Sequence, residues 1–290
     1  METILKGPGK TVIISPEKPT VLIGERINPT GKKRLAEALA GGKLEIVRRE
    51  AEAQVAAGAD VLDVNVSIPE ADEVVLLPRV LGLILETCDV PLCIDTANHT
   101  ALRAALEKYK KAVPEGKPLI NSVNGDETSL RNVLPLVVEF GAAVIVLAMD
   151  GKGIPPTAEK RLLAVRMVVE RAEAMGISRA DLIVDCLALA ASADSRAGLV
   201  TLETIELVRE EFGVNMTFGC SNISFGLPER GVVNQAFLAL SLSKGVNCPI
   251  VDAAKVRPLI LATDLLLGRD NYARRYVGAY RQRAGTPRVP

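Results

Sequence analysis

Carboxylate and amide side chains stand directly after short apolar runs of this sequence. Glu25 and Asn28 follow the first such run, Asp95 the third and Asn121 the fourth. Carboxylates and amides accept hydrogen bonds, amides also donate them, and carboxylates exchange protons. If these groups meet in space, they can hold a neutral ligand that is rich in N–H donors and ring acceptors. Each of them could equally serve a turn or a helix start, where Asn and Asp are common.

The pattern continues along the chain, so that every apolar run leads into a polar group. The complete set is Glu25 and Asn28, Asp63 and Asn65, Asp95, Asn121 and Asn124, Asp150, Asp185, Asn222, and Asp252. Almost no cations are expected beside these groups except Arg26 and Arg230, so the set is a poor match for a phosphate.

The runs themselves are short and aliphatic, as expected of buried parallel strands. They cover residues 21–23, 61–64, 91–94, 119–120, 144–147, 182–184, 216–218 and 249–251. Segments with helical periodicity lie between them, at residues 44–57, 74–86, 102–109, 130–139, 159–174, 202–212 and 232–244. Alternation of this kind favours an α/β protein with a closed TIM (β/α)8 barrel.

We expect one domain over residues 1–290, with a barrel core at about 20–268 and a C-terminal helical tail at 269–290. A barrel of this type needs roughly 250 residues. Its active site forms where the C-terminal ends of the strands meet the loops that follow them. The polar groups named above are therefore expected to share one mouth.

Composition narrows the classes of function. Lysine plus arginine equals aspartate plus glutamate, at 35 residues each, which argues against a nucleic-acid partner. No apolar run is long enough for a membrane span, and the first residues have no signal-peptide character, so we expect a cytoplasmic protein. Five scattered cysteines and a single histidine predict no bound metal of its own.

Two common catalytic motifs are missing. The glycines at 24 and 31 enclose too many residues for a phosphate-binding loop, and no serine stands in a nucleophile elbow. Proton chemistry would then rest on carboxylates, amides or bound water.

Five motifs together resemble the pterin-binding methyltransferases. They are residues 23–31 (IGERINPTG), 58–65 (GADVLDVN), 93–96 (CIDT), 120–122 (INS) and 219–225 (GCSNISF). This family includes the methyltetrahydrofolate:corrinoid/iron-sulfur protein methyltransferases and the folate domain of cobalamin-dependent methionine synthase. The resemblance covers almost the whole chain and implies a TIM barrel that forms a homodimer.

The resemblance also implies roles for individual residues. Asp95, Asn121 and Asp185 match the residues that hydrogen-bond the pterin ring. Asn222 matches the catalytic asparagine, which contacts the pterin nitrogen that carries the methyl group. Three more residues match positions around the folate, namely Glu25, Asn28 and Arg230.

The implied activity is methyl transfer between 5-methyltetrahydrofolate and the cobalt of a corrinoid (cobalamin), as in one-carbon metabolism of acetogenic or demethylating bacteria. The sequence has no corrinoid-binding motif, so the corrinoid is expected on a partner protein. Two alternatives stay open. One is a pterin enzyme similar to dihydropteroate synthase, although the loop and basic residues of that enzyme are missing. The other is a non-catalytic folate-binding or corrinoid-docking subunit.

Overall fold

The chain forms a barrel of eight parallel strands in a computed structural model that describes residues 1–69 and 71–283. In barrel order the strands are β10 (Ile250–Val251), β3 (Ile23–Ile27), β4 (Val61–Val64), β5 (Leu92–Asp95), β6 (Leu119–Gly125), β7 (Ala143–Asp150), β8 (Leu182–Asp185) and β9 (Asn215–Thr217). The ends of this sheet meet, because the backbone N–H of Ile250 donates to the carbonyl oxygen of Phe218 at 3.0 Å. The predicted α/β class and TIM barrel are confirmed.

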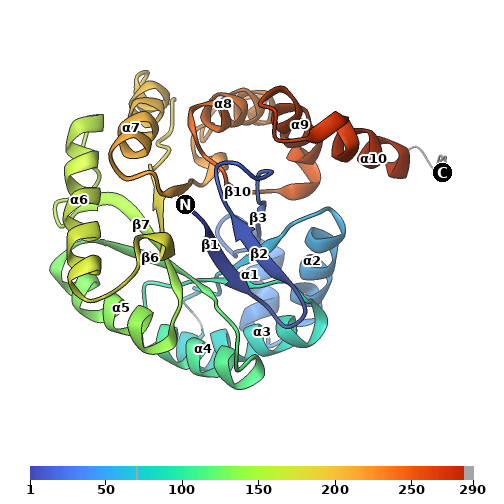
Figure 1. The fold of residues 1–290 in the computed structure, drawn as a ribbon. Coiled ribbons are helices and arrows are strands. Elements are labelled where there is room, and N and C mark those ends of the chain that lie inside the picture. The colour runs from blue at the N-terminus through green and yellow to red at the C-terminus, as the bar shows by residue number, and fades with distance from the viewer. Residues whose placement is uncertain (70, 284–290) are drawn as a thin grey trace.

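Helices connect the strands and surround the barrel (Figure 1). They are α1 (Lys33–Ala40), α2 (Glu45–Ala56), α3 (Glu73–Thr87), α4 (His99–Ala112), α5 (Glu127–Phe140), α6 (Ala158–Ala174), α7 (Ala197–Phe212), α8 (Arg230–Lys244), α9 (Ala253–Leu266) and α10 (Arg274–Arg283). The seven predicted helical segments correspond to α2 through α8, and α10 lies in the predicted tail. Residues 284–290 of that tail lie outside the described residues.

Side-chain caps fix the starts of several helices at the end of the barrel where the carboxyl ends of the strands lie. The Asn98 side chain accepts hydrogen bonds from the backbone N–H groups of Thr100 and Ala101, and α4 begins at His99. Asp126 caps α5 in the same way. Such caps satisfy N–H groups that a helix leaves unpaired.

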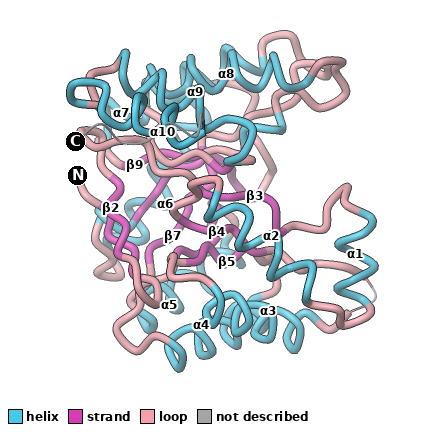
Figure 2. Tube along the Cα trace, turned by 90° about the vertical axis from the view of Figure 1, so that its right-hand side faces the viewer, coloured by secondary structure: helices cyan, strands magenta, loops and turns pink. Residues whose placement is uncertain are grey.

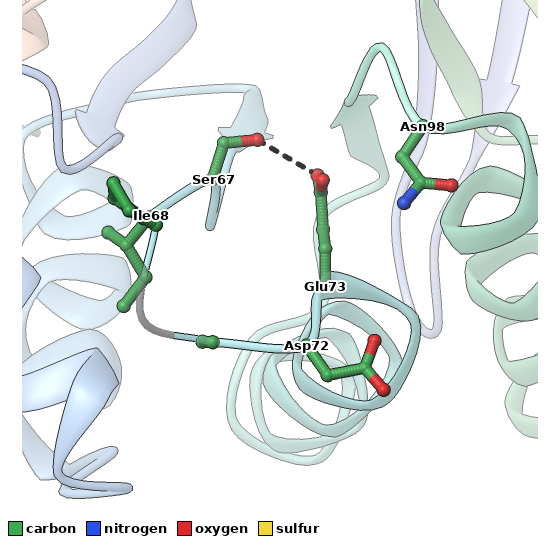
Figure 3. Close-up of a pocket in the computed structure, with 7 residues that line it drawn as sticks. Ser67, Ile68, Asp72, Glu73 and Asn98 are labelled. Carbon is green, nitrogen blue, oxygen red and sulfur yellow. Dashed lines mark hydrogen bonds between the residues drawn. The ribbon is translucent and has the colours of Figure 1, made fainter.

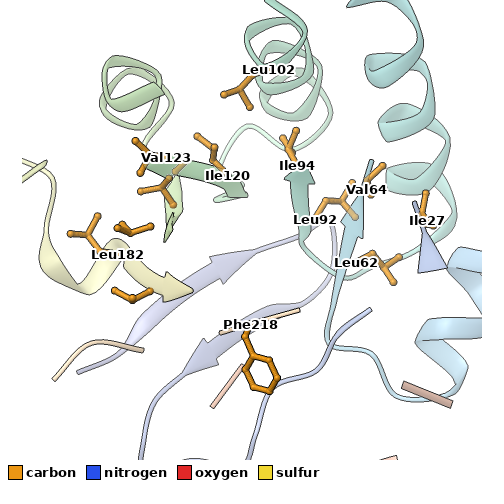
Figure 4. Close-up of a cluster of buried hydrophobic side chains, with 14 of the residues drawn as sticks. Ile27, Leu62, Val64, Leu92, Ile94, Leu102, Ile120, Val123, Leu182 and Phe218 are labelled. Carbon is orange, nitrogen blue, oxygen red and sulfur yellow. The ribbon is translucent and has the colours of Figure 1, made fainter. Parts of the chain in front are cut away.

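Two apolar layers hold the barrel together. Outward-facing strand residues pack against the helices, and Figure 4 shows part of this layer, with Leu62 and Val64 of β4 beside Leu92 and Ile94 of β5. Inward-facing residues form a separate cluster inside the barrel. It includes Ile23, Val61, Cys93, Leu119, Ile145 and Ile183. Side chains alternate along a strand, so the next inward positions are two residues further on.

An N-terminal hairpin closes the end of the barrel opposite the carboxyl ends of the strands. The sequence patterns did not predict this hairpin. Strands β1 (Thr3–Lys6) and β2 (Thr11–Ile14) pair antiparallel. Leu5, Val12 and Ile14 are buried in the inner cluster, so the hairpin contributes to the core. The hairpin crosses the barrel in Figure 1, and Figure 2 places it at the end opposite α1.

No helix in the described ranges, 1–69 and 71–283, is long and apolar enough to cross a membrane.

Candidate functional site: a polar layer at the barrel mouth

One polar layer lies directly above the apolar interior of the barrel. The inward positions that follow Ile23, Val61, Cys93, Leu119 and Ile183 by two residues are Glu25, Asp63, Asp95, Asn121 and Asp185. These residues come from five different strands, and strand register brings the carboxyl ends of those strands together. Four of the five were predicted as site residues; Asp63 was noted only as a strand-end residue.

Hydrogen bonds join the carboxylates and amides at the ends of β4, β5 and β6. The amide nitrogen of Asn121 donates to Asp63 at 3.2 Å. The amide nitrogen of Asn65 donates to Asp95 at 3.0 Å. Asp95 and Asn121 are themselves register partners on β5 and β6. The two amides therefore hold the two carboxylates in fixed positions on one side of the mouth.

Burial changes the protonation of these carboxylates. Removal from water raises the pKa of Asp63, and the negative charge of Asp95 raises it further. Burial also raises the pKa of Asp95, while the hydrogen bond from Asn65 opposes that rise. Carboxylates that are poorly solvated gain strongly from N–H donors on a ligand, because the donors replace the lost water.

Asp185 faces the mouth from β8. Its carboxylate accepts from the backbone N–H of Leu187 at 2.7 Å. Burial raises its pKa to about 7, against the opposing effects of that hydrogen bond and of the positive charge of Arg161. The Asp185 carboxyl group therefore changes charge near neutral pH.

The predicted catalytic residue, Asn222, lies in a tight turn after β9. It ends the short helix η2 (Cys220–Asn222), and its backbone N–H donates to the carbonyl oxygen of Gly219 at 3.3 Å. Asn222 is exposed. A Cβ atom at position 219 would lie 3.0 Å from the amide nitrogen of Asn222, so glycine leaves room for this amide. The amide group is accessible to a ligand that enters the mouth.

Contacts on both sides fix the turn. The Ser221 hydroxyl donates to Glu25 at 3.0 Å, and Arg230 donates to the Ser221 carbonyl oxygen at 2.7 Å. Arg230 also donates to the Ser224 hydroxyl at 3.0 Å. On the other side, the backbone N–H of Ala191 donates to the carbonyl oxygen of Ile223 at 2.9 Å. The residues around Asn222 are therefore held while its own side chain stays available.

Glu25 also lines a cavity of about 250 Å³ between β10, α8 and α9. Ser221, Asn234, Asp252 and Lys255 contribute to its wall. Burial raises the pKa of Glu25, and the hydrogen bond from Ser221 opposes this rise. Through Ser221, the structure thus links Glu25 of the polar layer to Arg230 and to the turn that carries Asn222.

Other strand-end residues serve local structure. The Asn28 side chain accepts from the backbone N–H of Thr30 at 3.0 Å, and Asn124 accepts from that of Asp126 at 2.8 Å. Asp150 accepts from the backbone N–H of Lys152 at 2.8 Å. Asp252 pairs with Lys255 at 3.2 Å. For these residues the structure gives a turn or ion-pair role, and the predicted folate contact of Asn28 stays a prediction.

Lys32 is a further cation at the mouth, besides the expected Arg26 and Arg230. Arg26 is paired with Glu50 at 3.2 Å. Lys32 donates to the carbonyl oxygens of Glu25 and Arg26, at 3.2 and 3.1 Å, and burial lowers its pKa. Both cations are occupied by protein groups, so the polar layer still presents mainly acceptors and amides.

A hollow of about 490 Å³ lies beside the β4 and β5 ends, and Figure 3 shows the side chains around it. Glu73, at the start of α3, accepts from the Ser67 hydroxyl at 3.0 Å and from the Thr96 hydroxyl at 2.6 Å. Its negative charge raises the pKa of Asp95. Glu73 thus ties the loops after β4 and β5 to each other.

Among the residues that the structure describes, no group of three or more histidine, cysteine, aspartate or glutamate side chains is arranged to hold a metal ion. The five cysteines are buried free thiols.

Sequence comparison identifies the family. Residues 24–252 match the family described as pterin binding enzymes. The chain belongs to this family. It is 33% identical over 270 residues to a methylcorrinoid:tetrahydrofolate methyltransferase of Eubacterium limosum, with 90% of this chain and 96% of that protein covered. It is also 32% identical to the methionine synthase of Mycobacterium leprae over 86% of this chain, but spans only 21% of that longer protein.

Solved structures of dihydropteroate synthases share the fold. A Yersinia pestis dihydropteroate synthase bound to a pterine-sulfa conjugate superposes with a TM-score of 0.67 at 17% identity, covering 92% of this chain. A Xanthomonas albilineans dihydropteroate synthase gives a TM-score of 0.63 at 20% identity. At such identities the likeness establishes the barrel and no more.

Sequence reasoning missed two side chains that organise the mouth, Glu73 and Arg161. Arg161 is 1% exposed, yet it lies on α6 among Ala158, Ala164 and Val165. A charged residue on the apolar face of an otherwise amphipathic helix is a signal that could have identified it. Glu73 gives no comparable signal, because acidic residues are common in the first turn of a helix.

Proposed function

We propose that this chain transfers a methyl group between tetrahydrofolate and the cobalt of a corrinoid that a separate protein carries. The observation that carries the proposal is the match to the methylcorrinoid:tetrahydrofolate methyltransferase, which extends over 96% of that relative. A shared mouth with an accessible Asn222 between fixed neighbours is consistent with it.

The polar layer suits the pterin ring of folate. The ring presents N–H donors and ring acceptors, and Asp95, Asn121 and Asp185 offer complementary groups from three strands. Several directed hydrogen bonds from rigid strand ends fix the orientation of the ring. Orientation matters because well-placed reactants can save roughly 7 to 11 kcal/mol of barrier.

Asn222 would act on the pterin nitrogen that bears the methyl group. When cobalt(I) attacks the methyl carbon, a cobalt–carbon bond forms, the carbon–nitrogen bond breaks, and the electron pair of that bond stays on the nitrogen, which is then protonated. A hydrogen bond from the Asn222 amide stabilises this nitrogen as charge develops, so it lowers the barrier. In the reverse direction the lone pair of this nitrogen in tetrahydrofolate attacks the methyl carbon of methyl-cobalt(III), cobalt(I) leaves with the electron pair of the cobalt–carbon bond, and the nitrogen releases its N–H proton to solvent.

The corrinoid protein would approach the open rim beside Asn222. Phe225 is 69% exposed there, and its ring lies 5.8 Å from the guanidinium carbon of Arg230. An aromatic side chain that is exposed in the free protein suits burial against a partner. Dimerisation belongs to the same proposal, with the homodimer as the expected solution state.

The direct test mixes the purified chain with 5-methyltetrahydrofolate and cobalt(I) cobalamin and follows the visible spectrum for methyl-cobalt formation. Methyl-cobalt formation that depends on both the chain and the folate supports the proposal. Folate binding without transfer would favour a docking subunit. Condensation of a pterin pyrophosphate with 4-aminobenzoate would favour an activity similar to dihydropteroate synthase, and either result would overturn the proposal.

A further inference from the structure

Arg161 of α6 is a buried guanidinium, 1% exposed, that forms no ion pair with any carboxylate among the residues that the structure describes. Its Nε donates to the carbonyl oxygen of Pro155 at 3.0 Å. One terminal nitrogen donates to the carbonyl oxygens of Cys186 and Leu187, at 3.0 and 2.8 Å. A buried charge is costly unless its surroundings compensate it, so this arrangement needs a reason.

The backbone around Leu187 supplies that reason. Leu187 has a φ of 58°, in the left-handed region that leucine rarely adopts. Its carbonyl oxygen accepts from Arg161 and from the Thr201 hydroxyl, the latter at 3.1 Å. Its N–H donates to Asp185 at 2.7 Å. Arg161 and Asp185 thus hold the same strained residue from its two sides.

We propose that Arg161 is a positioning residue for Asp185. It locks the left-handed Leu187, which aims the Leu187 N–H at the carboxylate, and its charge favours the ionised carboxylate that a pterin N–H would meet. The inference rests on the proposed function for its ligand. Asp185 itself was predicted to contact the pterin, whereas Arg161 is buried and binds the backbone that follows Asp185.

Arg161 is the charged group near Asp185 that affects the pKa of its carboxyl group. Across the neighbouring strands, Leu147 of β7 and Thr217 of β9 occupy the matching register positions, and neither titrates. The nearby thiols of Cys186 and Cys248 stay neutral, because burial raises the pKa of each far above neutrality. The positive charge of Arg161 lowers the pKa of Asp185 against the rise caused by burial.

The first test measures the titration midpoint of Asp185 in the ligand-free protein by carboxyl carbon NMR, with Asp185→Asn to assign the signal. We expect Arg161→Met to raise the midpoint by about one unit or more. Thr201→Val is the matched control, because it removes the hydrogen bond to Leu187 and a weak 3.5 Å one from Arg161 but leaves the charge. It should leave the midpoint where it is in the wild type. An unchanged midpoint in Arg161→Met would overturn the proposal.

A second variant separates a loss of folding stability from the loss of the Arg161 charge. Glycine adopts the left-handed conformation without strain, so Leu187→Gly added to Arg161→Met should recover thermal stability. It should not return the Asp185 midpoint to the wild-type value, because the charge is still missing. If the double variant titrates as the wild type does, Arg161 acts on the backbone alone and its electrostatic role is refuted.

A folate readout completes the test. Binding of 5-methyltetrahydrofolate to Arg161→Met should weaken roughly tenfold at pH 7 and recover toward the wild-type value at pH 9, where Asp185 is ionised in both proteins. Weakening that is independent of pH would contradict the proposal. If the wild type binds no folate but the NMR midpoint still moves, the proposed function fails while the inference about Arg161 stands.

Discussion

The Ser221 hydroxyl donates to both carboxylate oxygens of Glu25, at 3.0 and 3.2 Å, although the two residues are 196 positions apart in the chain. This contact joins the end of the first barrel strand, β3, to the turn that follows β9. Asn222 is the next residue. The contact therefore fixes the residue that we propose to act on the methylated nitrogen.

Loss of Glu25 should slow methyl transfer more than it weakens folate binding. In Glu25→Ala the Ser221 hydroxyl loses its acceptor, so the turn gains freedom and kcat should fall by roughly tenfold, about 1.4 kcal/mol of barrier. Steady-state kinetics and equilibrium folate binding measure the two effects. Glu25→Gln keeps an acceptor oxygen and should restore most of kcat.

The opposite pattern would show that Glu25 contacts folate itself. In that case Kd for folate would rise about as much as kcat/KM falls, and kcat would stay unchanged. Ser221→Ala is the matched control, since it removes the same hydrogen bond from the other side and should reproduce the kcat loss.

The stability that Asp185 contributes to the ligand-free protein should fall as the pH rises from its unfolded pKa of 3.8 to its folded pKa of about 7. The pKa of Asp185 is raised in the folded state from 3.8 to about 7, so folding favours its protonated form. That contribution is fully present below the unfolded pKa and disappears as the pH passes the folded value.

Asp185→Asn removes this dependence while keeping an acceptor for the Leu187 N–H. Urea unfolding of both proteins should show the variant gaining about 2 kcal/mol relative to the wild type between pH 5 and pH 7. A difference that stays constant over this range would mean that Asp185 titrates normally in the folded protein.

The N-terminal hairpin should matter for stability and not for binding. Leu5 is fully buried inside the barrel, so Leu5→Ala should cost about 2 to 5 kcal/mol of unfolding free energy. Its neighbour Ile4 is 39% exposed, and Ile4→Ala should change stability by no more than about 0.5 kcal/mol.

Folate affinity checks the position of the hairpin. Because the hairpin lies at the end of the barrel opposite the polar layer, Kd for 5-methyltetrahydrofolate should be the same in Leu5→Ala and in the wild type under folding conditions. A large loss of affinity in a well-folded variant would contradict that placement.

The strands and most helices were predictable because their patterns are local. Each of the eight predicted runs overlaps an observed strand, and the two-residue alternation places Asp95, Asn121 and Asp185 facing inward above apolar neighbours. The hairpin was missed although most of its strand residues are apolar, because strands β1 and β2 are only four residues long each and bury their side chains only against the barrel.

Pairings between strands could not be predicted from the sequence. The hydrogen bond from Asn121 to Asp63 requires a register that no local pattern encodes. The same holds for the contact between Ser221 and Glu25, and for the hydrogen bonds from Arg161 to the backbone after Asp185. The local hydrogen bonds of Asn28 and Asn124 also could not be told from a ligand role in the sequence; both side chains accept from backbone N–H groups two residues on, and the folate contact of Asn28 stays a prediction.

The central claim is that the Asn222 amide assists methyl transfer. The most direct measurement compares single-turnover methylation of cobalt(I) cobalamin by the wild type and by Asn222→Ala, both saturated with 5-methyltetrahydrofolate. We predict a rate that falls at least roughly tenfold, with folate still bound. A variant that transfers the methyl group as fast as the wild type would contradict the account.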